Sequence, residues 1–401
     1  MFDTANPFEA VMVDTCITSA VKNKPAAENL VRFMDGRKSL LQPERLTVAQ
    51  SVYLNTQNSV IFKPSELNMR IYELYGEKVK ALYDKWWDKI KTSRDIEKNK
   101  RELEEYRASL KPGDVALLGC LTEGGQGLAT ANNGKYIAVR STTKWAENIR
   151  VSRPKKLADF LARTPKAITA EMRRYPSYIA FLQSLSEAEI AELFDSLKEQ
   201  YGRDIFGQGY LYKIVDDCEI ADVDSLTNDE KENGIETTKP YYVPYDKGDK
   251  DGNRWYLETP FAIAWSKENV RFLKTNSGKK GEGMPVVRNP QFYFREGFCW
   301  NNLLNPNARL LKVKLKGESV NDVGSMSLYA IDLLSNKFIV ALLNSNVLFD
   351  YYREFINCSV NIQINDIKQL PIIIPTKEFA FLIESLADKA IKKKQKLVDN
   401  V

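Results

Sequence analysis

The sequence predicts an α+β fold, in which a helical hairpin linker is joined to a β-rich region that carries helical insertions. Three observations predict it. Apolar residues recur at helical spacing through residues 65–110, short β-type runs separated by turn residues follow from Tyr210, and helical periodicity returns at 155–201 and 337–355. With 401 residues, the chain is long enough for two or three domains with a large core.

The first predicted elements are a strand and two helices. Val11–Ala20 is a short apolar run, and a single strand of this kind cannot bury its own face. One apolar stripe marks the first helix of the hairpin: Ile71, Tyr75, Val79, Leu82, Trp86 and Ile90. Thr92-Ser93 predict a break, and Lys111-Pro112-Gly113 end the second helix. We expect Trp86-Trp87 to form core and rim instead of a ligand site.

Strand-like sequence dominates the rest of the chain. Val115–Leu118 begins a loop-rich stretch to Arg150, and a helical insertion covers 155–201. The later strand-like runs are Tyr210–Val215, Tyr241–Val243, Arg254–Leu257, Phe261–Trp265, Phe292–Phe294 and Leu310–Leu315. A helix over Lys337–Phe355 and a strand at Ile372–Ile374 follow. A basic amphipathic helix, Phe379–Val398, closes the chain, and we expect its lysines (389, 392, 393, 394 and 396) on a solvated face.

Composition narrows the class of protein. The chain has 43% hydrophobic and 28% charged residues, no histidine and a net charge of +5. The lack of histidine removes the commonest general base and metal ligand, and it lowers the expectation of catalysis. Five cysteines stand singly without a CxxC pair, which argues against a disulfide framework and a structural zinc. No secretion signal or membrane-length apolar run is present, so the cytoplasm is the expected location.

The stretch Leu117–Arg140, LLGCLTEGGQGLATANNGKYIAVR, resembles a nucleotide-binding loop and fails the tests for one. A Walker loop needs glycine where Ala129 stands and serine or threonine where Tyr136 stands. A dinucleotide fingerprint that starts at Gly125 needs its third glycine where Thr130 stands. We therefore expect a loop that bends the backbone and exposes Asn132, Asn133 and Lys135, or else a glycine-rich structural turn.

Motifs for catalysis are absent or weak. Adenine-N6 methylation requires an Asn-Pro-Pro-aromatic turn, and Asn289-Pro290-Gln291-Phe292 lacks the second proline. An acidic-x-x-x-Gly-x-Gly loop for S-adenosylmethionine is missing as well. Asp229-Glu230-Lys231 only approaches a nuclease pattern and lies in a polar segment. The sequence therefore predicts no catalytic residues, no metal site and no cofactor site in this chain.

Basic and aromatic residues alternate across Tyr241–Lys280. Such a mixture can hold phosphates and stack on bases, although an amphipathic sheet with an aromatic core explains the same composition. Within it, Lys267–Lys280 contains five basic residues and one acid, Glu268, a net of +4. This stretch is the best local candidate for phosphate binding.

Five segments, in order, resemble the target-recognition region of large adenine-specific DNA methyltransferases, namely type IIG restriction–modification enzymes and the BREX phage-exclusion methyltransferase. The segments are Leu118–Ile137 (GGQGLAT, NNGKY), Tyr201–Ile214, Arg254–Leu273 (RWYLETPFAIAW), Asn289–Trp300 (NPQFYFREGFCW) and Ala341–Pro375 (LLNSNVLFDYYREF, NIQINDIKQLPIIIP). The last is also similar to type I specificity subunits. Where the family often has Thr-Gly-Asx-Asn, this chain has Thr130-Ala131-Asn132-Asn133.

The resemblance implies a domain order. Residues 1–45 look like the end of a methyltransferase domain, 46–111 a helical hairpin linker, 112–375 the DNA target-recognition domain with the 155–201 insertion, and 376–401 a C-terminal helix. The catalytic motifs of the family are missing, so we expect the chain alone to be inactive. S-adenosylmethionine is expected in the missing catalytic domain, which would act in cis or in trans.

The implied function is sequence-specific recognition of double-stranded DNA in a restriction–modification or phage-defence system, with no membrane partner. Two alternatives stay open: half of a split methyltransferase that needs a catalytic partner chain, and a type I-like specificity subunit that docks other subunits through the hairpin. The DNA-binding residues expected from the resemblance and the charge pattern are Asn132, Asn133, Lys135, Lys247, Lys250, Arg254, Lys274, Lys279, Lys280, Arg288, Asn361 and Gln363.

Overall fold

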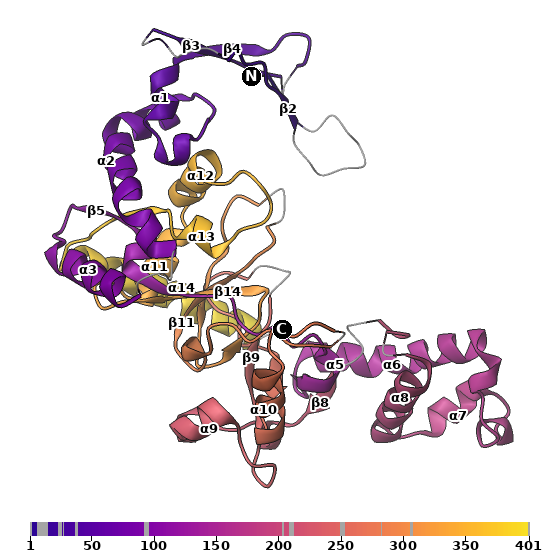
Figure 1. Cartoon of the computed structure of the whole chain (residues 1–401). Coiled ribbons are helices and arrows are strands. Elements are labelled where there is room, and N and C mark those ends of the chain that lie inside the picture. The colour runs from indigo at the N-terminus through magenta and orange to yellow at the C-terminus, as the bar shows by residue number, and fades with distance from the viewer. Residues whose placement is uncertain are drawn as a thin grey trace.

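The computed structural model describes residues 2–5, 15–22, 26, 28–36, 39–91, 96–202, 204–207, 212–248, 253–281, 283–304 and 308–399. It has an α+β fold, as the sequence predicts, with helices and mostly antiparallel sheets in separate stretches of the chain. In Figure 1 a small N-terminal sheet lies above a mixed body, and a helical arm extends to the right. Residues 11–14 of the predicted strand Val11–Ala20 and residues 210–211 of the predicted strand Tyr210–Val215 lie outside the described residues.

The N-terminal residues form more than the single strand expected from the sequence. A four-stranded sheet has the order β2-β1-β3-β4. Its strands are β1 (Phe2–Ala5), β2 (Thr15–Ile17), β3 (Leu30–Asp35) and β4 (Glu44–Ala49). Strands β3 and β4 pair antiparallel from Leu30↔Ala49 to Asp35↔Glu44. Within this pair only Phe33, Asp35 and Val48 are buried, so the apolar pattern that would signal strands is weak.

The helical hairpin is confirmed as two helices. After α1 (Gln50–Leu54) and the short helix η1 (Gln57–Ser59) come α2 (Glu66–Lys91) and α3 (Ile96–Ser109). The Trp86 ring stacks on Tyr106 at 4.5 Å between centroids, and Lys89 pairs with Glu102 across the two helices. Trp86 and Trp87 are both buried within the chain. They are therefore not a surface on which another subunit can dock.

The body contains two main sheets. One is antiparallel with the order β12-β11-β14-β6, and the other has the order β13-β9-β10-β7-β8. Their strands are β6 (Thr122–Gly125), β7 (Ile137–Arg140), β8 (Lys213–Val215), β9 (Tyr242–Asp246), β10 (Phe261–Ala264), β11 (Gly297–Asn301), β12 (Lys314–Lys316), β13 (Val320–Asn321) and β14 (Ser325–Ala330). A further pair joins β5 (Val115–Leu117) to β15 (Pro371–Ile373).

Short helices cover these sheets. They are α4 (Leu118–Leu121), α5 (Asn133–Tyr136), η5 (Asp217–Glu219), η6 (Val223–Ser225), α9 (Asn228–Asn233), α10 (Lys267–Thr275), η7 (Pro290–Phe292), α11 (Asn336–Leu343), α12 (Asn346–Phe355) and α13 (Ile364–Ile367). The helix predicted over Lys337–Phe355 is thus two helices, because Ser345 caps the second one. The largest apolar core joins the β11–β14 sheet to α11 and α12.

Two predicted strands are wrong. Arg254–Leu257 contributes only one isolated bridge, Trp255 with Lys314, and Phe292–Phe294 begins inside the helical turn η7 and forms no strand. Proline at the first position of that turn fixes a φ that suits a helical start. Conversely, β11 and β14 were not predicted. Four of the five residues of β11 and five of the six of β14 are buried, so neither strand has the apolar–polar alternation of a half-exposed strand.

The helical insertion begins earlier than predicted. Helix α6 (Lys144–Arg163) starts where loop was expected, with Thr143 accepting a hydrogen bond from the Ala146 amide as its N-cap. The arm continues through η2 (Pro165–Ala167), η3 (Met172–Arg174), α7 (Tyr178–Ser184) and α8 (Glu187–Tyr201). It has an apolar core of its own, in which Phe194 and Phe206 stack at 4.0 Å.

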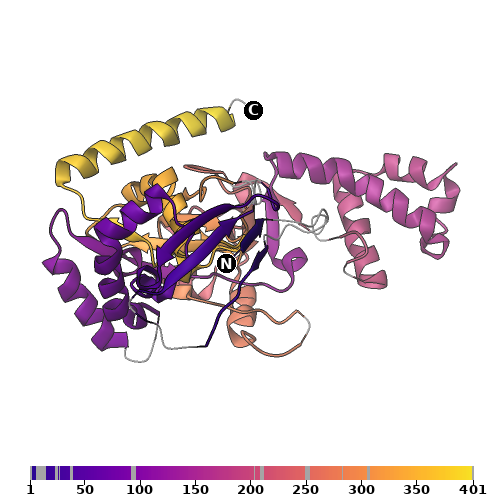
Figure 2. The ribbon, with the colours of Figure 1, turned by 90° about the horizontal axis from the view of Figure 1, so that it is seen from above.

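The C-terminal helix α14 (Lys377–Asp399) is confirmed. Figure 2 shows it along one edge of the body, with the arm projecting at the other end. It contacts α11, and Lys337 pairs with Asp388 at 2.7 Å. Lys389, Lys392, Lys393 and Lys396 are exposed, as expected for a solvated face, and Lys394 is half-buried.

Candidate nucleic-acid interface

The glycine-rich segment serves packing inside the chain. Strand β6 pairs with β14, and a side chain at Gly127 would overlap the backbone carbonyl of Asn321. Gly124 has a φ of +130° and lies against the carbonyl oxygen of Ser327. These glycines let two strands approach closely, which favours the structural-turn interpretation over an exposed glycine loop.

The polar residues after these glycines build a tight turn. Asn132 caps α5, accepting from the Lys135 amide at 3.3 Å, and Asn133 accepts from the Thr130 hydroxyl at 2.7 Å. Ala131 has a φ of +54°, a conformation that favours glycine, at the position where the resembling family often has glycine. Alanine therefore occupies a left-handed position in this turn, and both asparagine side chains already have partners.

Sequence-distant candidates meet at this turn. Ala129 and Val286 exchange backbone hydrogen bonds of 3.0 and 2.9 Å. Lys135 lies over the Phe272 ring of α10, 4.9 Å from its centroid. The structure thus brings Asn132, Asn133 and Lys135 next to the segment that contains Lys274, Lys279, Lys280 and Arg288.

A second group of candidates lies along the same edge. Val323 donates to the Leu128 carbonyl, Asn302 donates to Gly324, and Ile362 donates to Asn302, at 3.2, 3.3 and 2.9 Å. Lys247 lies 3.8 Å from the Asp322 carboxylate. We call this continuous run the loop edge: residues 128–135, 247–248, 276–281, 283–288, 301–304, 322–324 and 359–363.

Three candidates need separate mention. Asn361 and Gln363 hydrogen-bond to each other on the loop edge, and Gln363 begins α13. Arg254 is exposed and lies next to Asn253, which accepts a hydrogen bond of 2.8 Å from Lys394 of α14. Lys250 lies outside the described residues.

Acidic neighbours reduce the charge of the Lys267–Lys280 stretch. Lys267 pairs with Glu236 at 2.7 Å, and the Glu236 carboxylate raises the pKa of Lys267. Lys274 lies 3.8 Å from Glu232. Lys279 donates to Asn276, while Lys280 is exposed at the same turn. Lys267 and Lys274 of the helix therefore have acidic neighbours, whereas no ion pair among the described residues involves Lys279 or Lys280 of the turn.

Four of the eight aromatic rings of Tyr241–Lys280 belong to the core. Tyr242, Tyr245, Phe261 and Trp265 are buried, so they cannot stack on bases. The Tyr245 hydroxyl lies 3.2 Å from the Leu128 carbonyl and 3.0 Å from Asp322, and burial raises its pKa well above 10. The amphipathic-sheet interpretation is correct for these rings.

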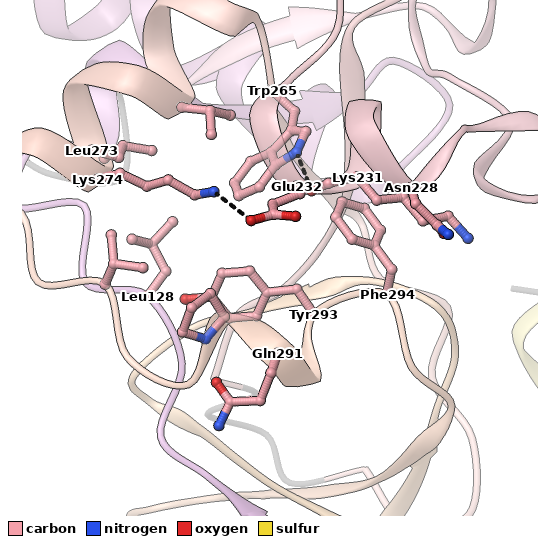
Figure 3. Close-up of a pocket in the computed structure, with 13 residues that line it drawn as sticks. Leu128, Asn228, Lys231, Glu232, Trp265, Leu273, Lys274, Gln291, Tyr293 and Phe294 are labelled. Carbon is pink, nitrogen blue, oxygen red and sulfur yellow. Dashed lines mark hydrogen bonds and ion pairs between the residues drawn. The ribbon is translucent and has the colours of Figure 1, made fainter.

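A pocket of about 520 Å³ lies between α9, α10 and residues 287–294. In Figure 3 the Glu232 carboxylate lies between the Trp265 and Tyr293 rings, and Lys274 points at it. Trp265 donates its ring N–H to the Lys231 carbonyl at 3.1 Å. Burial raises the pKa of the Tyr293 hydroxyl, which donates to the Arg288 carbonyl. A carboxylate at its centre makes the pocket unsuited to phosphate and suited to an apolar or planar group.

The Asn289-Pro290-Gln291-Phe292 string is structural. Asn289 has a φ of +48°, and its side-chain amide donates to the Gln126 carbonyl at 2.9 Å. That amide also lies against Gly125. It is therefore committed to the glycine-rich segment and is not presented to a base.

One ionic cluster was not predicted from the sequence. Lys314 pairs with Asp246 at 3.0 Å, and both side chains are almost fully buried. The Asp246 carboxylate also accepts from Ser319 at 3.0 Å. Lys316 donates to three backbone carbonyls, and burial lowers its pKa to about 8. This cluster fastens β9 of one sheet to β12 of the other. In the sequence the two lysines resemble the solvated side of an ordinary strand.

Side chains that could bind a metal ion do not cluster among the described residues. No group of Cys, Asp and Glu that could hold a metal ion occurs there. All five cysteines are free. No helix among the described residues is long and apolar enough to cross a membrane. Comparison of the chain with protein-family models and with curated proteins gives no match.

Proposed function

We propose that this chain is the sequence-specific, double-stranded-DNA recognition portion of an adenine-N6 DNA methyltransferase from a restriction–modification or phage-defence system. The observation that carries the proposal is the loop edge, where candidate residues from five separate parts of the sequence meet. Cations on such an edge hold phosphates, and amides can contact base edges.

The order of the resembling segments supports the same proposal. Leu118–Ile137 provides β6 and α5, Arg254–Leu273 provides β10 and most of α10, and Asn289–Trp300 provides most of β11. Ala341–Pro375 provides α12, α13 and β15. These segments, far apart in the sequence, build one body whose loops form the edge.

The proposal assigns chemistry to a partner domain. A catalytic domain in cis or in trans would bind S-adenosylmethionine and transfer the methyl group, and this chain alone would be inactive. Its place of action would be the cytoplasm. The hairpin α2–α3 would link recognition to catalysis through its buried contacts with the body.

Salt dependence of DNA binding tests the proposal. The chain should bind duplex DNA at low salt, with affinity falling steeply as salt rises, by about 0.9 log units per tenfold salt for each phosphate held. A comparable basic protein without the loop edge serves as the control for bulk charge. Absence of binding at low salt, or an affinity indifferent to salt, contradicts the proposal.

A further inference from the structure

The helical arm is joined to the body by helix α6. Ala146 and Ile149, near the start of α6, lie in the core of the β9–β10 sheet, whereas Leu157 and Leu161 lie in the arm core. Arg153 donates to the Tyr212 carbonyl and covers the Phe194 ring at 5.6 Å. Helix α6 therefore contributes residues to both cores, with Pro154 between them.

The tip carries exposed cations without acidic partners. Arg163, Lys166, Arg173 and Arg174 are exposed, and none of them forms an ion pair with a described residue. Residues 144–184 contain nine lysines and arginines against three acids, a net of +6. Exposed Tyr175 stands beside them, 38% exposed. Of these nine cations, Arg150 pairs with Glu187 and Arg153 is buried.

The arm has a basic tip and an acidic helix, α8. Helix α8 contains Glu187, Glu189, Glu192, Asp195 and Glu199 and only one lysine. Glu187 forms an ion pair with Arg150, and Asp195 forms one with Lys198. An anionic polymer would therefore meet the arm at its tip and not along α8.

Helix α6 carries the arm tip away from the body. Its 20 residues span about 30 Å, with Ala146 and Ile149 in the body core and Leu157 and Leu161 in the arm core. We propose that the arm tip holds the phosphate backbone of a duplex bound at the loop edge, beyond the base pairs that the edge reaches, without reading sequence. This inference rests on the proposed function and adds a second, sequence-independent contact to it.

Duplex length separates the two contacts. The triple variant Arg163→Gln, Arg173→Gln, Arg174→Gln is compared with wild type on random-sequence duplexes of about 12 and about 30 base pairs. On the long duplex we expect affinity at 0.15 M salt to fall roughly 10- to 100-fold and the salt slope to shrink by about 2 to 3. On the short duplex, which reaches only the loop edge, affinity should not change.

A charge-matched variant controls for bulk charge. Lys98→Gln, Lys100→Gln, Arg101→Gln removes three cations from α3, and it should bind both duplexes like wild type. Equal weakening of the arm variant on both lengths, or no weakening on the long one, overturns the arm contact while the loop edge still binds. Binding of the tip to vesicles with anionic lipid, without any length effect on DNA, also overturns it. Failure of wild type on both duplexes overturns the proposed function instead.

Discussion

At the residue scale, Gly127 tests whether the glycine-rich segment serves close packing of the backbone. We expect Gly127→Ala to destabilise the fold by about 1 to 3 kcal/mol, because the new methyl group overlaps the Asn321 backbone. Gly317 is the matched control, since an added Cβ there meets no atom within 4 Å. Urea unfolding of both variants measures the difference, and equal stabilities would contradict the packing role.

The buried Lys314–Asp246 pair makes a second residue-scale prediction. Lys314→Met leaves the buried Asp246 carboxylate with one cation fewer. We expect it to lower the free energy of unfolding by about 3 to 5 kcal/mol. Lys314→Met combined with Asp246→Asn removes both charges and should recover part of that loss. If the single variant unfolds at the wild-type denaturant midpoint, the pair does not fasten the two sheets.

The lowered pKa of buried Lys316 predicts that the free energy of unfolding depends on pH. Its pKa falls to about 8 in the folded chain because of burial, below about 10.4 when unfolded. Between these values the unfolded chain binds more protons, so the Lys316 contribution to stability rises with pH from about 8 to 10. Wild type should gain stability over this window relative to Lys316→Met. A difference between the two proteins that stays constant with pH refutes the lowered pKa.

At the element scale, Lys267 and Lys274 of α10 differ from Lys279 and Lys280 of the following turn, because only the two helix lysines have acidic neighbours. Lys279→Gln with Lys280→Gln should weaken binding to all duplexes about 10-fold or more at 0.15 M salt. Lys267→Gln with Lys274→Gln removes the same charge from cations that already pair with Glu236 and Glu232, so its effect should be smaller. Fluorescence anisotropy with one duplex compares the pairs. A larger loss from the second pair would contradict the assignment.

Elements with one clear periodicity could be predicted from the sequence. The stripe from Ile71 to Ile90 fixes α2, since only a helix brings those positions to one face. Strands β11 and β14 could not be predicted, because they are buried on both faces and lack alternation. The start of α6 was missed because its apolar residues are few and its surface is basic, although Thr143 is an ordinary N-cap.

The candidate site was predictable only as a set of residues. Charge and amide residues in 128–135 and 276–288 are visible in the sequence, but the Ala129–Val286 pairing that joins them is a long-range contact. Likewise, alternation in β12 predicts that Lys314 and Lys316 face solvent, whereas two packed sheets bury both. Only the fold shows which cations face one another and which face acids.

At the scale of the whole molecule, our proposal gives the loop edge and the arm tip two kinds of contact with one duplex. The edge carries amides and cations close together and could discriminate sequences. The tip carries cations alone and could add only affinity. Changes to the amides of the edge should therefore alter which sequences are bound, and changes to the cations of the edge or of the tip should alter how tightly all sequences are bound.

The most direct test of sequence recognition is selection from a random duplex pool by the purified chain, followed by sequencing of the retained DNA. Our account predicts enrichment of one common motif, which weakens at single positions when Asn361 or Gln363 is changed to alanine. Retention of DNA without any enriched motif, or no retention at low salt, would contradict it.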